Sequence, residues 1–373
     1  MPHRDLRQSL AMRSGYLACL FLVGSAMSGQ SQSPQLLQVA ECRTCAIQAT
    51  KTASIGEAGG YELSLRPFGV TRAMDGTVWV LEQGKATPTV FNSRGRFLRD
   101  VGRSGGGPGE YEQGGNIVPG ADSLMHVLDQ ALNRRSILQS DGHFIRSVPL
   151  YGVGGALGGA VALPNGHFIT NRSLTHESDV GYLFQEVDQA GKLLRQFGGD
   201  GSYRADRPFE SIRRLGAAPN NSFWSAKLYE YRLQLYDSQR RVSLDLIRRA
   251  DWFPTLARNA FPQGGRLDQP PTPEIKGIWQ DANGLVWVVA TLQSPQWKPT
   301  PLNGRPGQPF DTPLNEVLQT AIEVIDPATA TVITSTRVRF ATLWVLRNGY
   351  LASYRESSDG TPVVDIWQLT LKR

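Results

Sequence analysis

The 373-residue sequence is poor in the residues that build common catalytic and metal centres. It contains three Cys and five His, and neither a His-x-x-x-His motif nor a second Cys pair supplies ligands at zinc-like spacing. No Gly-x-Ser-x-Gly motif is present, and no Gly-Lys-Ser/Thr follows the glycines of 102–109, as it would in a phosphate-binding loop. The sequence therefore identifies no catalytic residue and no metal ligand.

Continuous basic stripes are also lacking. Lys and Arg number 39 against 33 Asp and Glu, which gives a net charge of +6. The Arg pairs, such as 134–135 and 213–214, lie far apart in the chain. Nucleic-acid binding requires clustered Lys and Arg, so we expect no nucleic-acid partner.

The one apolar run near the N-terminus is short. It spans Tyr16–Ala26 and follows Arg4, Arg7 and Arg13. A basic region, a short apolar stretch and small residues at its end are typical of a secretory signal peptide, whereas a membrane span needs about 20 apolar residues. We therefore expect residues 1–26 to be a signal peptide, the protein to be exported to the periplasm or the cell exterior, and no transmembrane span to remain.

Cys42 and Cys45 are the cysteines that remain after removal of this segment. Two Cys at this spacing in an exported protein predict a local disulfide. A redox-active pair would require a helix N-terminus to lower one thiol pKa, whereas residues 46–50 are typical of an extended segment. Free thiols and a redox-active pair are the alternatives.

What the sequence does contain is a repeat. Residues 79–95 (WVLEQGKATPTVFNSRG) and 126–142 (HVLDQALNRRSILQSDG) align without a gap and start 47 positions apart. A period in this range is typical of four-stranded propeller blades. Turn pairs followed by β-branched or aromatic stretches recur six times. These pairs are Asp75-Gly76, Asp122-Ser123, Asn165-Gly166, Asn221-Ser222, Asn283-Gly284 and Asn348-Gly349.

We therefore predict an all-β fold, a six-bladed β-propeller with four-stranded antiparallel blades around a central channel. No linker rich in Pro, Gly and Ser divides the chain, so one propeller is expected over residues 60–373, preceded by a lead-in at 27–59 that carries the Cys pair. Tyr61–Val70 is expected to begin the ring beside the last blade, because closure removes exposed sheet edges. We expect a monomer.

The segment Gly102–Tyr111 (GRSGGGPGEY) resembles the loops between blades of NHL-type six-bladed propellers. Asp129 and Arg134 match the acidic and Arg positions of that family, while Glu82 replaces the Asp in the first unit. The similarity covers roughly residues 60–200 and is greatest to exported bacterial propellers that carry a Gly-Pro-Gly-Glu-aromatic loop. It implies the propeller fold and does not imply an activity.

Two conspicuous features have structural interpretations. The glycines of 102–109 fit a connection between blades that needs positive φ angles. Glu82 and Asp129 occupy equivalent positions in the repeat, so we interpret them as caps of turns and not as a catalytic pair.

Two insertions lengthen the later repeats, at Asp251–Pro273 and Thr291–Thr312. Long loops on a compact fold often bind ligands or partners. Their aromatic residues Trp252, Phe253 and Trp297 are therefore candidate binding residues. Ordered decoration that covers a blade is the alternative.

Basic residues in the expected inner strands form a second candidate set. Arg72, Arg213 and Lys276, with Arg214 and Arg339 in similar regions, could point into the channel. Converging cationic groups recognise carboxylate or phosphate, which would suit an anionic ligand. Salt-bridged rim residues are the alternative.

These observations predict an exported binding propeller that presents a surface to a protein or a small molecule. The alternative is a metal-assisted hydrolase or lyase with its site at the channel mouth, similar to gluconolactonase-like or amidating-lyase-like propellers. Scattered carboxylates in such a site would suit Ca²⁺ or Mg²⁺. No cofactor is assigned, and whether the protein is an enzyme stays open.

Overall fold

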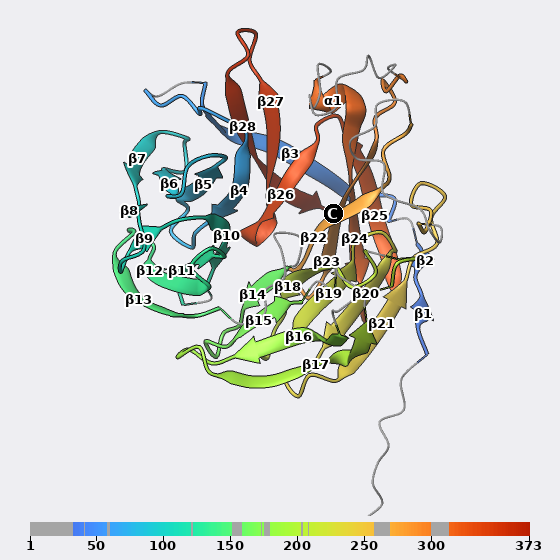
Figure 1. The fold of residues 1–373 in the computed structure, drawn as a ribbon. Coiled ribbons are helices and arrows are strands. Elements are labelled where there is room, and N and C mark those ends of the chain that lie inside the picture. The colour runs from blue at the N-terminus through green and yellow to red at the C-terminus, as the bar shows by residue number, and fades with distance from the viewer. Residues whose placement is uncertain are drawn as a thin grey trace, which may run out of the picture. The chain divides into compact units, whose positions relative to one another are not determined.

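The computed structural model describes residues 33–40, 42–57, 60–120, 122–150, 159–172, 174, 180–202, 204–207, 209–256, 269–299 and 313–373. The expected signal peptide, residues 1–26, lies outside this part of the chain. The described elements are almost all β-strands, and they form six main sheets (Figure 1).

The first three sheets each pair four strands antiparallel in chain order. Blade 1 contains β4 (Pro67–Arg72), β5 (Val78–Glu82), β6 (Thr89–Phe91) and β7 (Phe97–Asp100). Blade 2 contains β10 (Gly114–Pro119), β11 (Leu124–Asp129), β12 (Arg134–Gln139) and β13 (Phe144–Pro149). Blade 3 contains β14 (Ala160–Ala162), β15 (Phe168–Asn171), β16 (Val180–Val187) and β17 (Leu193–Ser202).

The other three sheets also recruit strands from the N-terminal part of the chain. Blade 4 contains β18 (Arg213–Ala217), β19 (Phe223–Lys227), β20 (Arg232–Tyr236) and β21 (Val242–Ile247), and β1 (Gln35–Leu36) is added to it. Blade 5 contains β22 (Glu274–Gln280), β23 (Val286–Gln293), β24 (Leu318–Asp326) and β25 (Thr331–Val338), and β2 (Gln38–Val39) is added to it. Blade 6 contains β26 (Thr342–Leu346), β27 (Tyr350–Glu356), β28 (Pro362–Lys372) and β3 (Ala46–Ile55). The remaining elements are the short strands β8 (Arg103–Ser104) and β9 (Glu110–Tyr111), the helix α1 (Leu314–Val317) and the 3-10 turn η1 (Arg347–Gly349).

The first strands of the six blades contact one another in a closed cycle, β4 to β10, β14, β18, β22, β26 and back to β4. They are therefore the inner strands of a ring, and the predicted six-bladed propeller is confirmed. As expected, the segment Tyr61–Val70 leads into the first inner strand, which contacts β26 of the last blade.

The repeat sequence folds in this way because each second strand is buried on both faces. In β5, Val78 and Val80 pack toward blade 6 in one apolar cluster. Trp79 and Leu81 point the other way and pack toward blade 2. Side chains alternate between the two faces of a strand, so an unbroken apolar run joins two neighbouring blades.

The ring is closed by a strand that the repeat pattern does not include. β3 pairs antiparallel with β28, so that Ile55 lies opposite Val364 and Ala53 opposite Ile366. Residues 46–55, which the sequence analysis places in the lead-in, thus form the outer strand of blade 6. The edge of the last sheet is thereby covered by a strand from the N-terminal part of the described chain.

Before β3, the chain runs along the outside of two blades. β1 pairs parallel with β21 and β2 pairs parallel with β25. Leu37 between them is buried in the core shared by these blades. Cys42 and Cys45 follow and form a disulfide with a Cα–Cα distance of 5.2 Å, which confirms the predicted bond.

A fully buried carboxylate joins blade 3 to blade 4. Glu186 of β16 accepts two hydrogen bonds from Arg240, at 2.7 and 2.8 Å. Arg195 donates to it at 2.6 Å, and Nδ1 of His167 lies 2.6 Å from Oε1. Burial alone would raise the pKa of Glu186, but the bonds from Arg240, Arg195 and His167 lower it to about 2. Glu186 is therefore an ionised clamp between blades.

Glu82 and Asp129, at equivalent positions in the repeat, both accept hydrogen bonds from the segment before their own blade. Asp129 accepts hydrogen bonds from the backbone N–H of Glu112 (2.9 Å) and of Leu132 (3.1 Å). Glu82 accepts them from the Tyr61 hydroxyl (2.6 Å) and the Ser64 N–H (2.8 Å). Each carboxylate fixes the segment that enters its own blade. Asp129 also caps the turn at Leu132, as predicted, whereas the Glu82 carboxylate binds the segment before β4 and caps no turn of its blade among the described contacts.

The glycines of the loop before β10 allow backbone conformations and close contacts that a side chain would prevent. Gly102 has φ +79°, and a Cβ there would lie 2.4 Å from the Gly109 carbonyl oxygen. Arg134 donates to the carbonyls of Gly106 (2.9 Å) and Gly107 (2.8 Å), while Glu110 accepts from the Gly107 N–H. These hydrogen bonds fix the loop as a connection between blades 1 and 2, as its glycines predicted.

Candidate functional site

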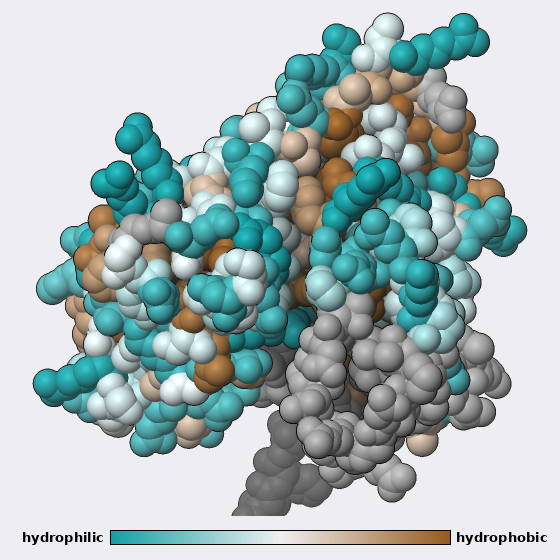
Figure 2. Space-filling model, turned by 90° about the horizontal axis from the view of Figure 1, so that it is seen from above, coloured by the Kyte–Doolittle hydropathy of each residue, from teal (hydrophilic) through white to brown (hydrophobic). Residues whose placement is uncertain are grey.

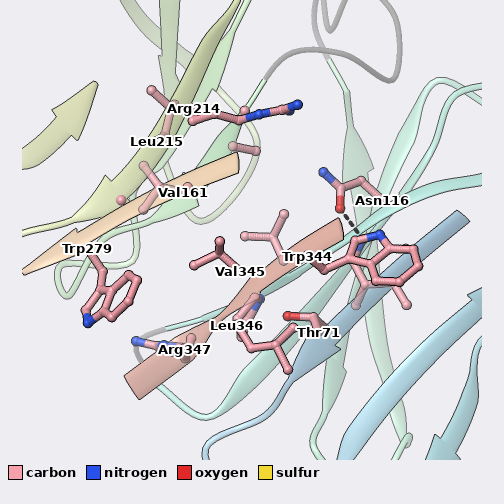
Figure 3. Close-up of a pocket in the computed structure, with 18 of the residues that line it drawn as sticks. Thr71, Asn116, Val161, Arg214, Leu215, Trp279, Trp344, Val345, Leu346 and Arg347 are labelled. Atoms are coloured by element: carbon pink, nitrogen blue, oxygen red, sulfur yellow. Dashed lines mark hydrogen bonds between the residues drawn. The ribbon is translucent and has the colours of Figure 1, made fainter. Parts of the chain in front are cut away.

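A cavity of about 550 Å³ lies inside the ring of inner strands (Figure 3). All six blades contribute to its lining. Figure 3 shows Val161, Leu215 and Val345 around the cavity, with Arg214 and Arg347 on different sides of it. This cavity is the central channel that the fold predicts.

Both insertions leave the propeller at the same end of the channel. In an antiparallel blade, the first strand begins, the second ends and the third begins at one end of the sheet. Asp251–Pro273 precedes the first strand of blade 5. The second insertion, predicted from Thr291, begins in the last residues of the second strand, which ends at Gln293, and leads toward the third, which starts at Leu318. We call this end the mouth. The channel residues near it are Phe68, Asn116, Arg214, Lys276 and Trp344.

Four inner strands carry a β-bulge close to the mouth. The pairing register shifts by one residue on the inner strand at Phe68 in blade 1, Gly115 in blade 2, Lys276 in blade 5 and Leu343 in blade 6. Regular residues of an inner strand point toward the neighbouring blades, whereas a bulge can re-aim a side chain. All four bulge residues line the cavity.

The charged part of the mouth comes from blades 4 and 5. Arg214 and Lys276 both contact Oε1 of Glu274, each at 2.9 Å. Burial alone would raise the pKa of Glu274, but Lys276 and Arg214 hold it below its ordinary value. The carboxylate is therefore ionised at neutral pH, and it pairs with both cations.

The aromatic part of the mouth comes from blades 1 and 6. Phe68 is 48% exposed, which is high for a side chain of its size. Nε1 of Trp344 donates to the Phe68 carbonyl at 3.3 Å, which links the inner strands of blades 6 and 1. Blades 1 and 4 are three positions apart in a ring of six, so Phe68 and Arg214 lie on opposite sides of the channel, whereas Trp344 of blade 6 adjoins blade 5.

At the end of the channel opposite the mouth, a hydrogen bond connects the inner strands of two blades. Arg347, after β26, donates to the carbonyl of Gly120, after β10 of blade 2. This bond joins two blades that are not neighbours. Arg72 stacks on the Tyr350 ring at 4.0 Å. The candidate Arg72 is thus held against blade 6 near this end.

The other candidate cations differ in position. Lys276 reaches the mouth. Arg213 is buried and donates to the Ile212 carbonyl at 3.1 Å and to that of Glu210, and burial lowers its pKa to about 10. Its neighbour Arg214 lines the channel instead.

The aromatic candidates lie apart from the channel lining. Phe253 is buried, and its ring lies 5.5 Å from that of Tyr231. Trp252 packs on the same core and is covered by the Arg337 guanidinium at 4.1 Å. Trp297 is partly buried in the turn after β23, where its backbone N–H donates to the Ser294 carbonyl.

Gly69 is a channel residue that the sequence did not single out. It is buried, and a Cβ added to it would meet no heavy atom of the described residues within 4 Å. Because Gly69 is buried and yet has open space beside its Cα, it faces the cavity, whose lining it joins. By contrast, a Cβ on Gly277 would lie 2.6 Å from Val345.

The outer surface is mixed. Figure 2 shows hydrophobic residues as separate patches among hydrophilic ones. Large hydrophobic side chains of outer strands, such as Leu98 and Leu194, are partly exposed. Such scattered exposure is ordinary for folded proteins, so the channel is the more specific candidate site.

Within the described ranges, no group of three or more His, Cys, Asp or Glu is placed to hold a metal ion. Ca²⁺ or Mg²⁺ binding stays a prediction. In the same ranges, no helix has the length and apolar character needed to cross a membrane.

No protein-family model and no curated protein matches the chain. Solved structures do. A member of the DUF4221 family from Bacteroides vulgatus is 11% identical, with a TM-score of 0.59 over 88% of this chain and 99% of that one. A protein from Bacteroides fragilis, described as exported in its name, is 10% identical, with a TM-score of 0.56 over 91% and 100%. At these identities the likeness shows the propeller fold alone, and the NHL-type resemblance stays a prediction.

Proposed function

We propose that this protein is an exported binding propeller that takes a small ligand through the mouth into its channel. The observation that carries the proposal is the channel cavity, because four bulged inner strands direct residues into it. Small-molecule sites are concave and about 300–1,000 Å³ in volume, and the channel cavity falls within this range. Export is supported by the signal-like segment 1–26 and by the Cys42–Cys45 disulfide, since disulfides persist in oxidising compartments.

Replacing Gly69 by Phe is expected to abolish ligand binding and leave the fold intact. The new ring would enter open space in the channel, because a Cβ there meets no described atom within 4 Å. The measurement is saturation-transfer NMR of the mature protein with benzoate, naphthalene sulfonate, indole and benzyl alcohol. The fragments that bind the wild type are expected to lose their signal with the variant.

Gly106→Phe is the matched control. Gly106 is exposed, and the nearest atoms to an added Cβ lie 3.8 and 3.9 Å away. This variant adds the same ring outside the channel and is expected to bind the fragments as the wild type does. If Gly69→Phe bound them equally well, the ligand site would lie elsewhere.

The metal-assisted hydrolase or lyase remains the competing function. Metal analysis of the purified mature protein separates the two. A stoichiometric, tightly bound ion would favour the enzyme and contradict the proposal of a binding propeller.

A further inference from the structure

We propose that a small monovalent anion, chloride, binds between blades 2 and 3 beside Arg135 and His126. Neither residue belongs to the channel lining, so the inference goes beyond the proposed function and stands independently of it. It rests on three buried nitrogen atoms that have no hydrogen-bond partner in the described part of the chain: Nε and Nη1 of Arg135 and Nδ1 of His126. The two residues are nearly inaccessible to solvent, with Arg135 1% and His126 6% exposed.

Both side chains leave one face of the blade 2 sheet and meet the same ring of blade 3. In the pairing of β11 with β12, Arg135 lies opposite Leu128 and His126 lies opposite Ile137. Opposite residues share a face, as do residues two apart in one strand, so Arg135 and His126 are diagonal neighbours on that face. The Arg135 guanidinium lies 4.5 Å from the centroid of the Phe168 ring, and the centroid of the His126 ring lies 5.2 Å from it.

Arg135 is a buried cation that lacks a countercharge at contact distance. Burial and the nearby Arg146 lower its pKa to about 10, so the guanidinium is charged at neutral pH. It donates a hydrogen bond to the Asp188 carbonyl at 3.2 Å, and within the described ranges no carboxylate pairs with it. The Asp188 carboxylate attracts it only from a greater distance. A buried ion without a partner is costly, and a bound anion would remove that cost.

The next interface shows the partner that such a cation has when the chain supplies it. Between blades 3 and 4, Arg240 is 2% exposed and makes two hydrogen bonds to the Glu186 carboxylate. His167 contacts the same carboxylate. Between blades 2 and 3 an Arg and a His meet again, but no carboxylate of the described residues joins them. A small anion would take the place that the Glu186 carboxylate has in the other interface.

The propeller fold does not require this polar pair. In the aligned segment 79–95, Trp79 stands at the position of His126 and Pro88 at that of Arg135. Trp79 is fully buried in an apolar cluster, so the corresponding interface forms there without a polar pair. Between blades 2 and 3, Phe168 and Leu128 also belong to an apolar cluster. This packing favours the smallest anion, and a spherical chloride ion accepts N–H donors from any direction.

His126 would contribute as a neutral donor. Burial, with Arg135 and Arg146 nearby, lowers its pKa to about 3, so at neutral pH the imidazole carries one N–H. With that hydrogen on Nδ1, His126 and Arg135 both donate to the anion.

Stability measured against chloride concentration tests this inference. Urea unfolding of the mature protein is followed by Trp fluorescence at neutral pH, with sodium chloride replacing sodium gluconate at constant ionic strength. A ligand that binds only the folded protein stabilises it by mass action. We expect the equilibrium constant for unfolding to fall about tenfold for each tenfold rise in chloride above its dissociation constant. An equilibrium constant that does not change with chloride would contradict the proposal and indicate water beside Arg135.

Arg135→Met removes the charge and keeps an apolar side chain of similar length. The variant is expected to lose the chloride dependence. In gluconate it should be at least as stable as the wild type, because it removes a buried charge that has no partner. Arg94→Met is the matched control, since Arg94 is exposed and should keep the wild-type response. Equal losses of the response in both variants would show general screening of charge and contradict the site.

Crystals of the mature protein grown in bromide locate the ion, because bromide scatters anomalously. A peak beside Nε of Arg135 and Nδ1 of His126 is expected in the wild type and not in Arg135→Met. A peak there without an effect of chloride on stability would show an adventitious ion only and contradict the proposal. Fragment binding and its loss in Gly69→Phe do not depend on this site, so failure of this inference and failure of the proposed function are distinguishable.

Discussion

Replacing Glu186 by Gln is expected to lower the free energy of unfolding by about 3–5 kcal/mol. Arg240 is almost fully buried, with its side chain 2% exposed, and Glu186 is its bidentate partner. The neutral amide would leave that guanidinium without a countercharge in a low-dielectric site, where an unpaired ion is costly. Denaturant unfolding followed by Trp fluorescence at neutral pH measures the loss.

Glu57→Gln is the matched control. Glu57 also pairs with an Arg at 2.6 Å, but its side chain is 47% exposed. Exposed ion pairs contribute about 0–1 kcal/mol. Equal losses in the two variants would show that the clamp between blades 3 and 4 is no stronger than a surface pair.

Replacing His126 by Phe is expected to remove much of the acid sensitivity of the fold between pH 6.5 and 4.5. His126 is 6% exposed, and burial, with Arg135 and Arg146 nearby, lowers its pKa to about 3. The unfolded chain therefore takes up a proton near pH 6.5, whereas the folded protein does not. Stability falls as the pH decreases through this window, by about 1.4 kcal/mol per unit or about 2–3 kcal/mol in total.

The measurement is the free energy of unfolding against pH for the wild type and His126→Phe. The apolar ring suits the site, since the His126 ring already lies 5.2 Å from that of Phe168. The same substitution at His143, which is exposed, should leave the slope unchanged. Parallel curves for the wild type and His126→Phe would contradict the prediction.

The fold could be predicted from the sequence in the segments where the chain repeats itself. Residues 79–95 and 126–142 lie in blades 1 and 2, and their turns and strands occur where the pattern places them. β3 was not recognisable as a blade strand, because it has no repeat unit of its own and its partner β28 is at the other end of the chain. Pairing over such a distance leaves no local signal.

The site could be predicted less well than the fold, because its geometry depends on one-residue shifts in the pairing of the inner strands. Arg213 and Arg214 are neighbours of the same type, yet one is buried among carbonyl groups and the other lines the channel. The bulge that brings Lys276 into the lining is a property of strand pairing and not of composition. Trp252 and Phe253 were expected at the surface because they lie in an insertion. In the structure they pack on the core.

The pairing of β3 with β28 also determines the order in which the molecule can be completed. The Thr52 hydroxyl donates to the Ile366 carbonyl, across 314 residues of chain. Blade 6 can form only when both segments are present, and closing so large a loop is slow because its entropy is lost before the contacts form. During synthesis, β3 is made before β28 and lacks this partner strand until β28 has been made. Until β28 has paired with β3, blade 6 keeps an open sheet edge, which is the kind of surface that chaperones and proteases recognise.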